Sequence, residues 1–253
     1  MKIKYPFVIE ILNTERVHPL QAASNHSGEK MVEMVTSGGI GTIDYLPPKR
    51  SSSVVLNEIL LPERDSPLFA SLPEFLQLRK APRPEATRNA RNNLWLAVKW
   101  REKRKHSQFC RVFELRLPTD APLADARDAV ARFAERSLLA QGMIVDLAIH
   151  EMAGDSEGSA PSSRTAYLMC TTRSFIDGEF GIKNREWNAF AQLVAWRSAW
   201  FDALMPILDS ESPSPCTQGL IKFAKRFGTK ASHVFQPPAP PCEPPAAPNR
   251  MRL

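Results

Sequence analysis

One stretch in the C-terminal half of this 253-residue chain constrains its fold more than any other. Residues 166–172 form an apolar run that ends in two threonines, which predicts a buried strand followed directly by Arg173. Two glycines then predict a turn, and a tryptophan-rich helix is expected to begin at Arg185. This layout places Arg173, and Lys183 after the turn, near one strand end, where phosphate-binding sites are often built. Both cations are therefore candidate nucleic-acid contacts.

Apolar periodicity predicts most of the other elements. Strands are expected over residues 7–12, 109–117 and 143–150, and helices over residues 93–105, 122–142 and 185–208. A pair of prolines and a serine run make residues 46–53 a predicted loop. Strands and helices that alternate in this way permit an α+β fold.

Positive charge is concentrated in one segment. The chain has a formal net charge of +6, whereas residues 79–111 alone hold eleven Lys or Arg against two Glu, a net charge of +9. Such an excess favours polyanions as partners. The cluster of Lys103, Arg104 and Lys105 is the strongest nucleic-acid candidate in the segment.

Two tryptophans lie within the basic segment, at positions 95 and 100. Basic side chains with aromatic ones are typical of single-strand binding, because the cations neutralise phosphates while the bases stack. Trp95 fits the core face of an amphipathic helix equally well, in which case the cations form a solvated face. The sequence leaves both interpretations open.

Further motifs precede and follow the strand at residues 166–172. The most distinctive is the segment QAASNHSGEK at residues 21–30, and shorter blocks lie at residues 59–63, 94–105, 116–118 and 196–200. Together these blocks resemble, in order, the motifs of the MobA/MobL relaxases, plasmid-mobilisation enzymes that nick one DNA strand. The resemblance covers roughly residues 1–209, and a shared order of many blocks is more specific than any single block.

The resemblance implies a metal site that is altered here. In those relaxases the strand carries His-x-His just before Thr-Thr-Arg, and an upstream histidine completes the ligands of a divalent metal. In this chain the pair is Thr165 and Tyr167, and the upstream ligand is His150. A lone imidazole sets neither the affinity nor the geometry that Lewis-acid catalysis needs. We therefore expect no cofactor, and a divalent metal at His150 follows from the resemblance alone.

The nucleophile position is altered as well. The family motif similar to residues 21–30 contains a tyrosine that attacks the scissile phosphate, and Asn25 stands at that position. A carboxamide has no hydroxyl to ionise, so Asn25 cannot be the nucleophile. No other residue is assigned a catalytic role.

The resemblance also implies the fold and the domain organisation. We expect an α+β fold, with a mainly antiparallel central sheet flanked by helices, over residues 1–209. Residues 66–93 are interpreted as an insertion and residues 210–235 as a basic amphipathic segment that packs on the domain, contacts DNA or contacts a partner. Many prolines make residues 236–253 a predicted disordered tail.

Three functions remain open. The first is a nucleic-acid-binding protein of plasmid or mobile-element transfer, a degenerate relaxase domain that binds single-stranded or hairpin DNA, or RNA, without nicking DNA itself. The second is an active nicking enzyme with a relocated nucleophile, and the third is a protein-interaction module, with other transfer proteins as partners. Four widely spaced cysteines without a C-x-x-C pair indicate reduced thiols in a cytoplasmic protein, and no apolar window reaches the length of a membrane span.

Overall fold

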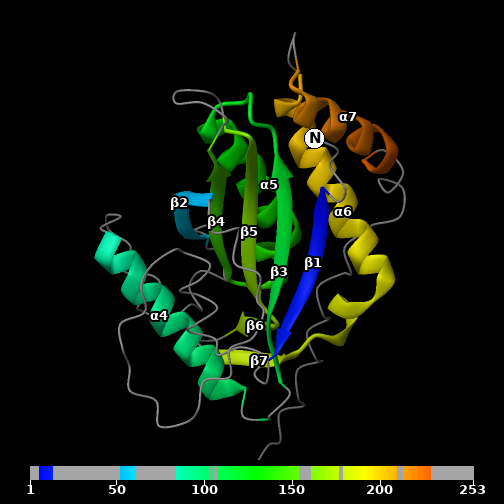
Figure 1. Cartoon of the computed structure of the whole chain (residues 1–253). Helices are drawn as coiled ribbons and strands as arrows, with labels where there is room; N and C mark the ends of the chain where they lie inside the picture. The colour runs from blue at the N-terminus through cyan, green and yellow to red at the C-terminus, as the bar shows by residue number, and fades with distance from the viewer. Residues whose placement is uncertain are drawn as a thin grey trace, which may run out of the picture.

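The computed structural model describes residues 6–13, 52–60, 84–102, 104, 107–153, 161–176, 179–209 and 213–228. These ranges hold a five-stranded sheet, a two-stranded hairpin and four α-helices (Figure 1). Every strand pair is antiparallel, so the predicted α+β fold with a mainly antiparallel central sheet is confirmed. Asn25 and the proline-rich residues 236–253 lie outside the described residues.

The large sheet has the strand order β1-β3-β5-β4-β2. Its strands are β1 (Phe7–Asn13), β2 (Ser52–Leu60), β3 (Gln108–Leu117), β4 (Val145–Met152) and β5 (Ser163–Thr171). The hairpin of β6 (Arg173–Ile176) and β7 (Glu179–Lys183) follows β5 directly. The helices are α4 (Pro84–Arg101), α5 (Leu123–Ser137), α6 (Phe190–Leu204) and α7 (Pro215–Phe227).

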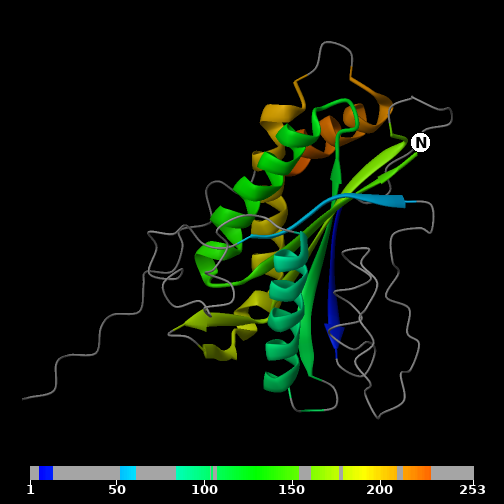
Figure 2. The same ribbon diagram turned by 90° about the vertical axis from the view of Figure 1, so that its left-hand side faces the viewer.

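The two faces of the sheet carry separate apolar clusters, because side chains alternate along each strand. On β5, Ala166, Leu168 and Cys170 join the cluster formed with α5, α6 and α7, which lie on the same side of the sheet (Figure 2). Met169 belongs to the opposite cluster, where it packs with Trp95 and other residues of α4. The sheet is therefore covered on both faces.

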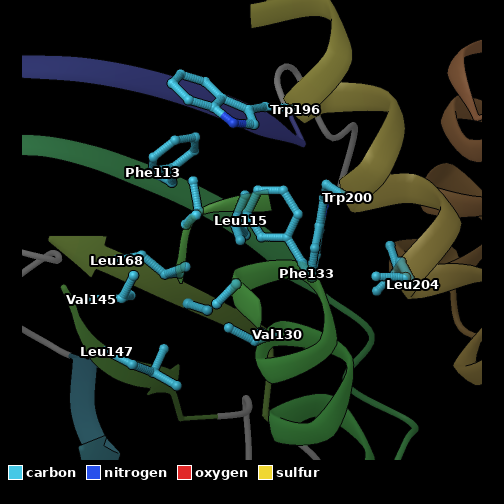
Figure 3. Close-up of a cluster of buried hydrophobic side chains, with 14 of the residues drawn as sticks. Phe113, Leu115, Val130, Phe133, Val145, Leu147, Leu168, Trp196, Trp200 and Leu204 are labelled. Carbon is cyan, nitrogen blue, oxygen red and sulfur yellow. The ribbon is translucent and has the colours of Figure 1, made fainter. Parts of the chain in front are cut away.

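Aromatic rings hold the first face together (Figure 3). Phe113 of β3 lies edge-on to Phe133 of α5 and to Trp196 of α6, with ring centroids 5.9 and 5.3 Å apart. Phe133 in turn contacts Trp200 at 5.8 Å. Each edge-to-face pair stabilises the fold by about 0.5–1.5 kcal/mol beyond the area it buries. These contacts fix β3 relative to α6.

A buried ion pair anchors α4 to the sheet. The Nε atom of Arg91 lies 2.9 Å from both carboxylate oxygens of Asp146 on β4, and Nε1 of Trp95 donates to Oδ2 of Asp146 at 2.9 Å. Trp95 is fully buried, so the structure favours the core interpretation of this residue over a base-stacking one. The anchored helix ends one residue before Glu102, which lies at the end of the sheet where β3 begins and β5 ends.

Three local predictions were wrong in their bounds. The helix expected over residues 93–105 spans Pro84–Arg101, so residues 84–93 of the segment interpreted as an insertion are helical. The loop expected over residues 46–53 ends earlier, because β2 begins at Ser52 and pairs with β4. The expected glycine turn is largely the hairpin, with Gly181 inside β7. In the two strand cases, backbone pairing overrides a weak local propensity.

Other segments follow the sequence closely. After α5 a short 3-10 helix, Leu139–Gln141, leads to Gly142, whose φ of 81° lies in the left-handed region that favours glycine. Within the expected basic amphipathic segment, residues 210–235, Pro215–Phe227 form α7. Leu220 and Ala224 of this helix are buried in the main core, so the helix packs on the domain. None of the helices in the described ranges is long and apolar enough to cross a membrane.

Candidate nucleic-acid interface

A hollow of about 870 Å³ opens where the end of α4 meets β3, the hairpin and a short 3-10 helix, Arg185–Asn188. Among the described residues, one carboxylate lines it, that of Glu102. Six cationic side chains also line it, namely Arg101, Arg104, Arg111, Arg173, Lys183 and Arg185. The lining charge is therefore strongly positive. Low-dielectric walls of one charge sign concentrate the field and attract polyanions.

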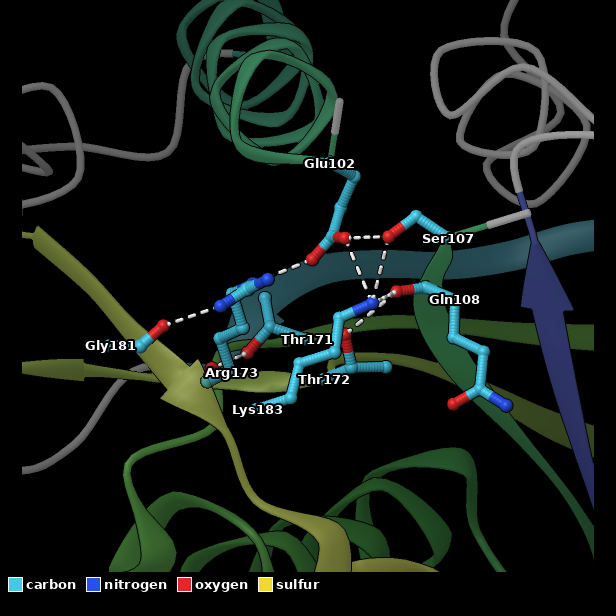
Figure 4. A network of polar contacts seen from close by, with 8 residues as sticks. All are labelled: Glu102, Ser107, Gln108, Thr171, Thr172, Arg173, Gly181 and Lys183. Carbon is cyan, nitrogen blue, oxygen red and sulfur yellow. Dashed lines mark hydrogen bonds and ion pairs between the residues drawn. The ribbon is translucent and has the colours of Figure 1, made fainter. Parts of the chain in front are cut away.

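Glu102 lies at the centre of a polar network (Figure 4). Its Oε1 is 2.6 Å from Nε of Arg173, and its Oε2 is 2.8 Å from Nζ of Lys183. Ser107 also donates its hydroxyl to Oε2 of Glu102. Antiparallel pairing of β6 with β7 sets Arg173 opposite Lys183, so the hairpin delivers both cations to one carboxylate.

The network keeps Glu102 ionised. Burial by itself would raise the pKa of this carboxyl, but hydrogen bonds from Arg173, Lys183 and Ser107 together lower it below its usual value. A buried carboxylate with three donors is a stable anchor between α4, β3 and the hairpin. The hairpin is thereby held against the end of α4.

The structure brings Arg173 and Lys183 together, as the sequence predicts, and both side chains also form hydrogen bonds within the fold. Arg173 donates from Nη1 to the Gly181 carbonyl at 2.8 Å, and Lys183 donates to the Ser107 hydroxyl at 3.0 Å. Their charge is partly offset by Glu102. As phosphate contacts, they remain a prediction.

The threonine pair shapes the strand end. The Thr171 hydroxyl donates to the Arg173 carbonyl at 2.8 Å and accepts from the backbone N–H of Ile144 at 3.1 Å. The Thr172 hydroxyl donates to the Gln108 carbonyl at 3.2 Å. Both hydroxyls therefore fix the backbone from which Arg173 projects.

Exposed cations form the rim of the hollow. The side chains of Arg101, Arg104 and Arg185 are all exposed to solvent. Of the predicted basic cluster, Arg104 thus lines the hollow, whereas Lys103 and Lys105 lie outside the described residues.

Arg111 is the functional candidate that sequence reasoning missed. It lies on β3, is only 4% exposed and lines the hollow. The available signal was an arginine that shares its face of the predicted strand at residues 109–117 with apolar residues, since buried cations are rare unless a counter-charge or ligand faces them.

Exposed apolar side chains occur at or near lining positions in the sequence. Trp100 is 69% exposed and precedes Arg101, and Phe190 is 80% exposed and follows the 3-10 helix that lines the hollow. Ile182 itself lines the hollow and is largely exposed. Large apolar side chains held in water next to cations suit base stacking.

The three relaxase ligand positions lie together on the α4 face of the sheet. His150 pairs with Thr165 across β4 and β5, and the rings of His150 and Tyr167 lie edge-on with centroids 5.2 Å apart. A cation lies at the same place, because Arg116 of β3 donates from Nη1 to the Thr165 hydroxyl at 2.8 Å. Arg116 also forms an ion pair with Glu114 at 3.2 Å.

These residues do not fit a divalent metal. Burial, assisted by the charge of Glu114, raises the pKa of Tyr167 to about 12, so its phenol stays protonated at neutral pH. The Thr165 hydroxyl already accepts from a guanidinium, whose charge would repel a second cation. Within the described ranges, no group of three or more His, Cys, Asp or Glu side chains is placed to hold a metal.

The antiparallel sheet brings positions 150, 165 and 167 together on one face, an arrangement that resembles a relaxase-type domain. The chain belongs to the MobA/MobL family, whose family model matches residues 20–213. No curated protein matches the chain.

A solved structure also resembles the fold. It comes from work on the molecular basis of vancomycin resistance transfer in Staphylococcus aureus. Its sequence is 22% identical to this chain, and the TM-score is 0.57. The similarity covers 80% of this chain and 91% of that chain. At this identity the likeness supports the fold.

Proposed function

We propose that the protein binds single-stranded or hairpin DNA during plasmid or mobile-element transfer and does not nick that DNA itself. The observation that carries this proposal is the hollow, which among the described residues is lined by six cations and one carboxylate at the end of the sheet where β3 begins. Counter-ion release from the DNA backbone is the largest sequence-independent contribution to such binding.

The preference for single strands is supported by Trp100 and Phe190. A duplex keeps its bases stacked inside, whereas a single strand or hairpin loop offers base faces to aromatic side chains. The two exposed rings, which lie close in sequence to Arg101 and to the 3-10 helix that begins at Arg185, would supply such a surface, with phosphates of the stacked strand bound by the rim cations.

The absence of nicking is supported by the ligand positions and by the nucleophile position. Asn25 replaces the tyrosine of the family motif, and Arg116 provides a fixed cation beside Thr165 where the family places a metal. An arginine neutralises and orients a phosphate through paired N–H donors. It does not ionise a tyrosine or coordinate a leaving oxygen, so the old site can hold DNA without cleaving it.

Relocated nicking by Tyr167 is the second candidate, because its ring contacts that of His150. The raised pKa of Tyr167 argues against it, since the phenol would have to lose its proton before attacking phosphorus. A covalent DNA adduct that Tyr167→Phe abolishes would establish this alternative.

Binding is tested by fluorescence anisotropy with four probes of equal length: single-stranded DNA, hairpin DNA, duplex DNA and structured RNA. Titrations at several salt concentrations give an affinity and a salt slope for each probe. We expect the single strand and the hairpin to bind more tightly than the duplex, with a steep slope. No binding at low salt would contradict the proposal. Tighter binding of the RNA than of any DNA probe would make RNA, and not DNA, the ligand.

A further inference from the structure

Arg111 carries a buried positive charge without a counter-charge among the described residues. Its Nη2 donates to Oδ1 of Asn188, while Nε and Nη1 have no hydrogen-bond partner in the described part of the chain. Its guanidinium lies 4.8 Å from the ring centroid of Trp196. Burial lowers the pKa of Arg111, and no carboxylate within the described ranges contributes to that shift.

The carboxylate of Glu102, which also lines the hollow, is already paired with other cations. Glu102 binds Arg173 and Lys183. Among the described lining cations, Arg111 is the buried one, and it has no acidic partner within the described ranges. The acceptor that Arg111 does have is a neutral amide oxygen on an exposed side chain, Asn188. Such an oxygen stands where an oxygen of an anion would bind more strongly, since hydrogen bonds between two charged groups are the stronger ones.

We propose that Arg111 forms the floor of an oxyanion site that takes one phosphate of a nucleic-acid backbone. The site rests on the proposed DNA-binding function and adds a specific contact to it. Asn188 swings toward solvent or shares the phosphate, and the Trp196 ring holds the guanidinium plane in place from the other side. The exposed Arg185 at the rim then reaches a neighbouring phosphate.

A ligand-binding Arg111 and a purely structural Arg111 predict opposite effects of its substitution on the melting temperature. A structural Arg111 would stabilise the fold, so its loss would lower the melting temperature. A ligand-binding Arg111 instead carries an uncompensated charge in the free protein. Arg111→Met, which keeps the length and removes the charge, is therefore expected to keep or raise the melting temperature and to weaken binding.

The test uses the full chain, Arg111→Met, Arg111→Lys and the control Arg132→Gln. Arg132 is a half-buried arginine on α5 that donates to the Ala203 carbonyl, outside the residues that line the hollow. Melting temperature is followed against inorganic phosphate at constant ionic strength set with chloride. Affinity for a single-stranded oligonucleotide is measured in parallel.

We expect phosphate to raise the melting temperature of the unmodified protein and of Arg132→Gln in a saturating manner, and not that of Arg111→Met. Oligonucleotide affinity should fall about 10- to 100-fold in Arg111→Met, the loss of one charge-assisted contact, and the salt slope by about 0.7. Arg111→Lys keeps the charge without the paired donors and should fall between the two. If Arg111→Met does not fold, this intermediate affinity of Arg111→Lys carries the test.

Two outcomes overturn the inference. Loss of the phosphate effect with unchanged oligonucleotide affinity would make the site one for free phosphate ions. The second is an Arg111→Met variant with unchanged oligonucleotide affinity and salt slope, when substitution of the rim arginines does weaken binding. This result would remove Arg111 from the interface and leave the proposed function intact. Failure of the unmodified protein to bind any nucleic acid is a separate result, and it contradicts the proposed function itself.

Discussion

The rim of the hollow gives the sharpest quantitative prediction. Arg101, Arg104 and Arg185 are exposed and line the hollow, so replacing all three by Gln removes three cations without opening a cavity in the core. Exposed substitutions of this kind change stability by about 0.5 kcal/mol or less each. The free energy of unfolding should therefore stay nearly constant, and any change in DNA binding reflects the surface.

The magnitude follows from counter-ion release. Each phosphate contact to a single strand contributes about 0.7 to the slope of log affinity against log salt, so three lost contacts flatten it by about 2 units. When salt rises fourfold, from about 50 to 200 mM, the affinity of the triple variant should therefore fall by a factor about 16-fold smaller than the factor for the unmodified protein.

A matched control is available on α7. Lys222, Lys225 and Arg226 are exposed, and α7 lies at the opposite end of the molecule from the hairpin (Figure 1). Replacing these three by Gln changes the net charge by the same amount at the other end of the molecule. Charges farther apart than the Debye length, about 10 Å at 0.1 M salt, are largely screened from each other. Fluorescence anisotropy across a salt series compares both triple variants. Equal slopes for the two variants would refute the assignment of the hollow and leave only a general charge effect.

Three further predictions concern the surroundings of the hollow. Trp100→Ala should weaken single-strand binding by about 1–3 kcal/mol in anisotropy titrations, the loss of one stacked base, whereas Met205→Ala, another exposed apolar side chain, should not; equal effects would contradict stacking. Asp146→Asn should lower the free energy of unfolding in urea by about 3–5 kcal/mol, because it removes the carboxylate charge that faces the buried Arg91 guanidinium, and a loss below about 1 kcal/mol would show that the pair is dispensable. The pKa of Glu102 is lowered on folding, so its contribution to stability is present above the usual value of 4.5 and is lost as the pH falls through the lower folded value. The difference in free energy of unfolding between the unmodified protein and Glu102→Gln should hence be constant near neutral pH and shrink in acid. A difference that grew in acid would show that folding raises the pKa of Glu102.

The sequence predicts the local parts of this fold well. The apolar run of residues 166–172 and the tryptophan-rich helix after it are both present, because strand and helix periodicity depend on near neighbours. The strand β2 was not predicted at all, and its start was assigned to a loop, since Ser52 and Ser53 have little strand character of their own and are held by pairing with β4. Register of this kind depends on a partner about one hundred residues away along the chain.

The site shows the same division. Arg173 and Lys183 could be placed at one strand end from sequence, because the chain leads directly from one to the other. Their shared carboxylate could not, since Glu102 lies 71 residues before Arg173 and meets it only when α4 is anchored on the sheet. Arg111 was hidden for a similar reason: an arginine in an apolar strand reveals neither its exposure nor its partners until the fold closes around it.

The claim that this domain holds DNA without cutting it is tested most directly by one experiment on one substrate. A supercoiled plasmid carrying a transfer origin is incubated with the protein and Mg²⁺ or Mn²⁺, with binding measured on the same DNA, and the products are separated under denaturing conditions. We predict a retarded complex, DNA that remains supercoiled after the protein is removed, and no covalent protein–DNA band. Nicked circles together with a covalent band that disappears in Tyr167→Phe would contradict the account and show that the nucleophile had been relocated.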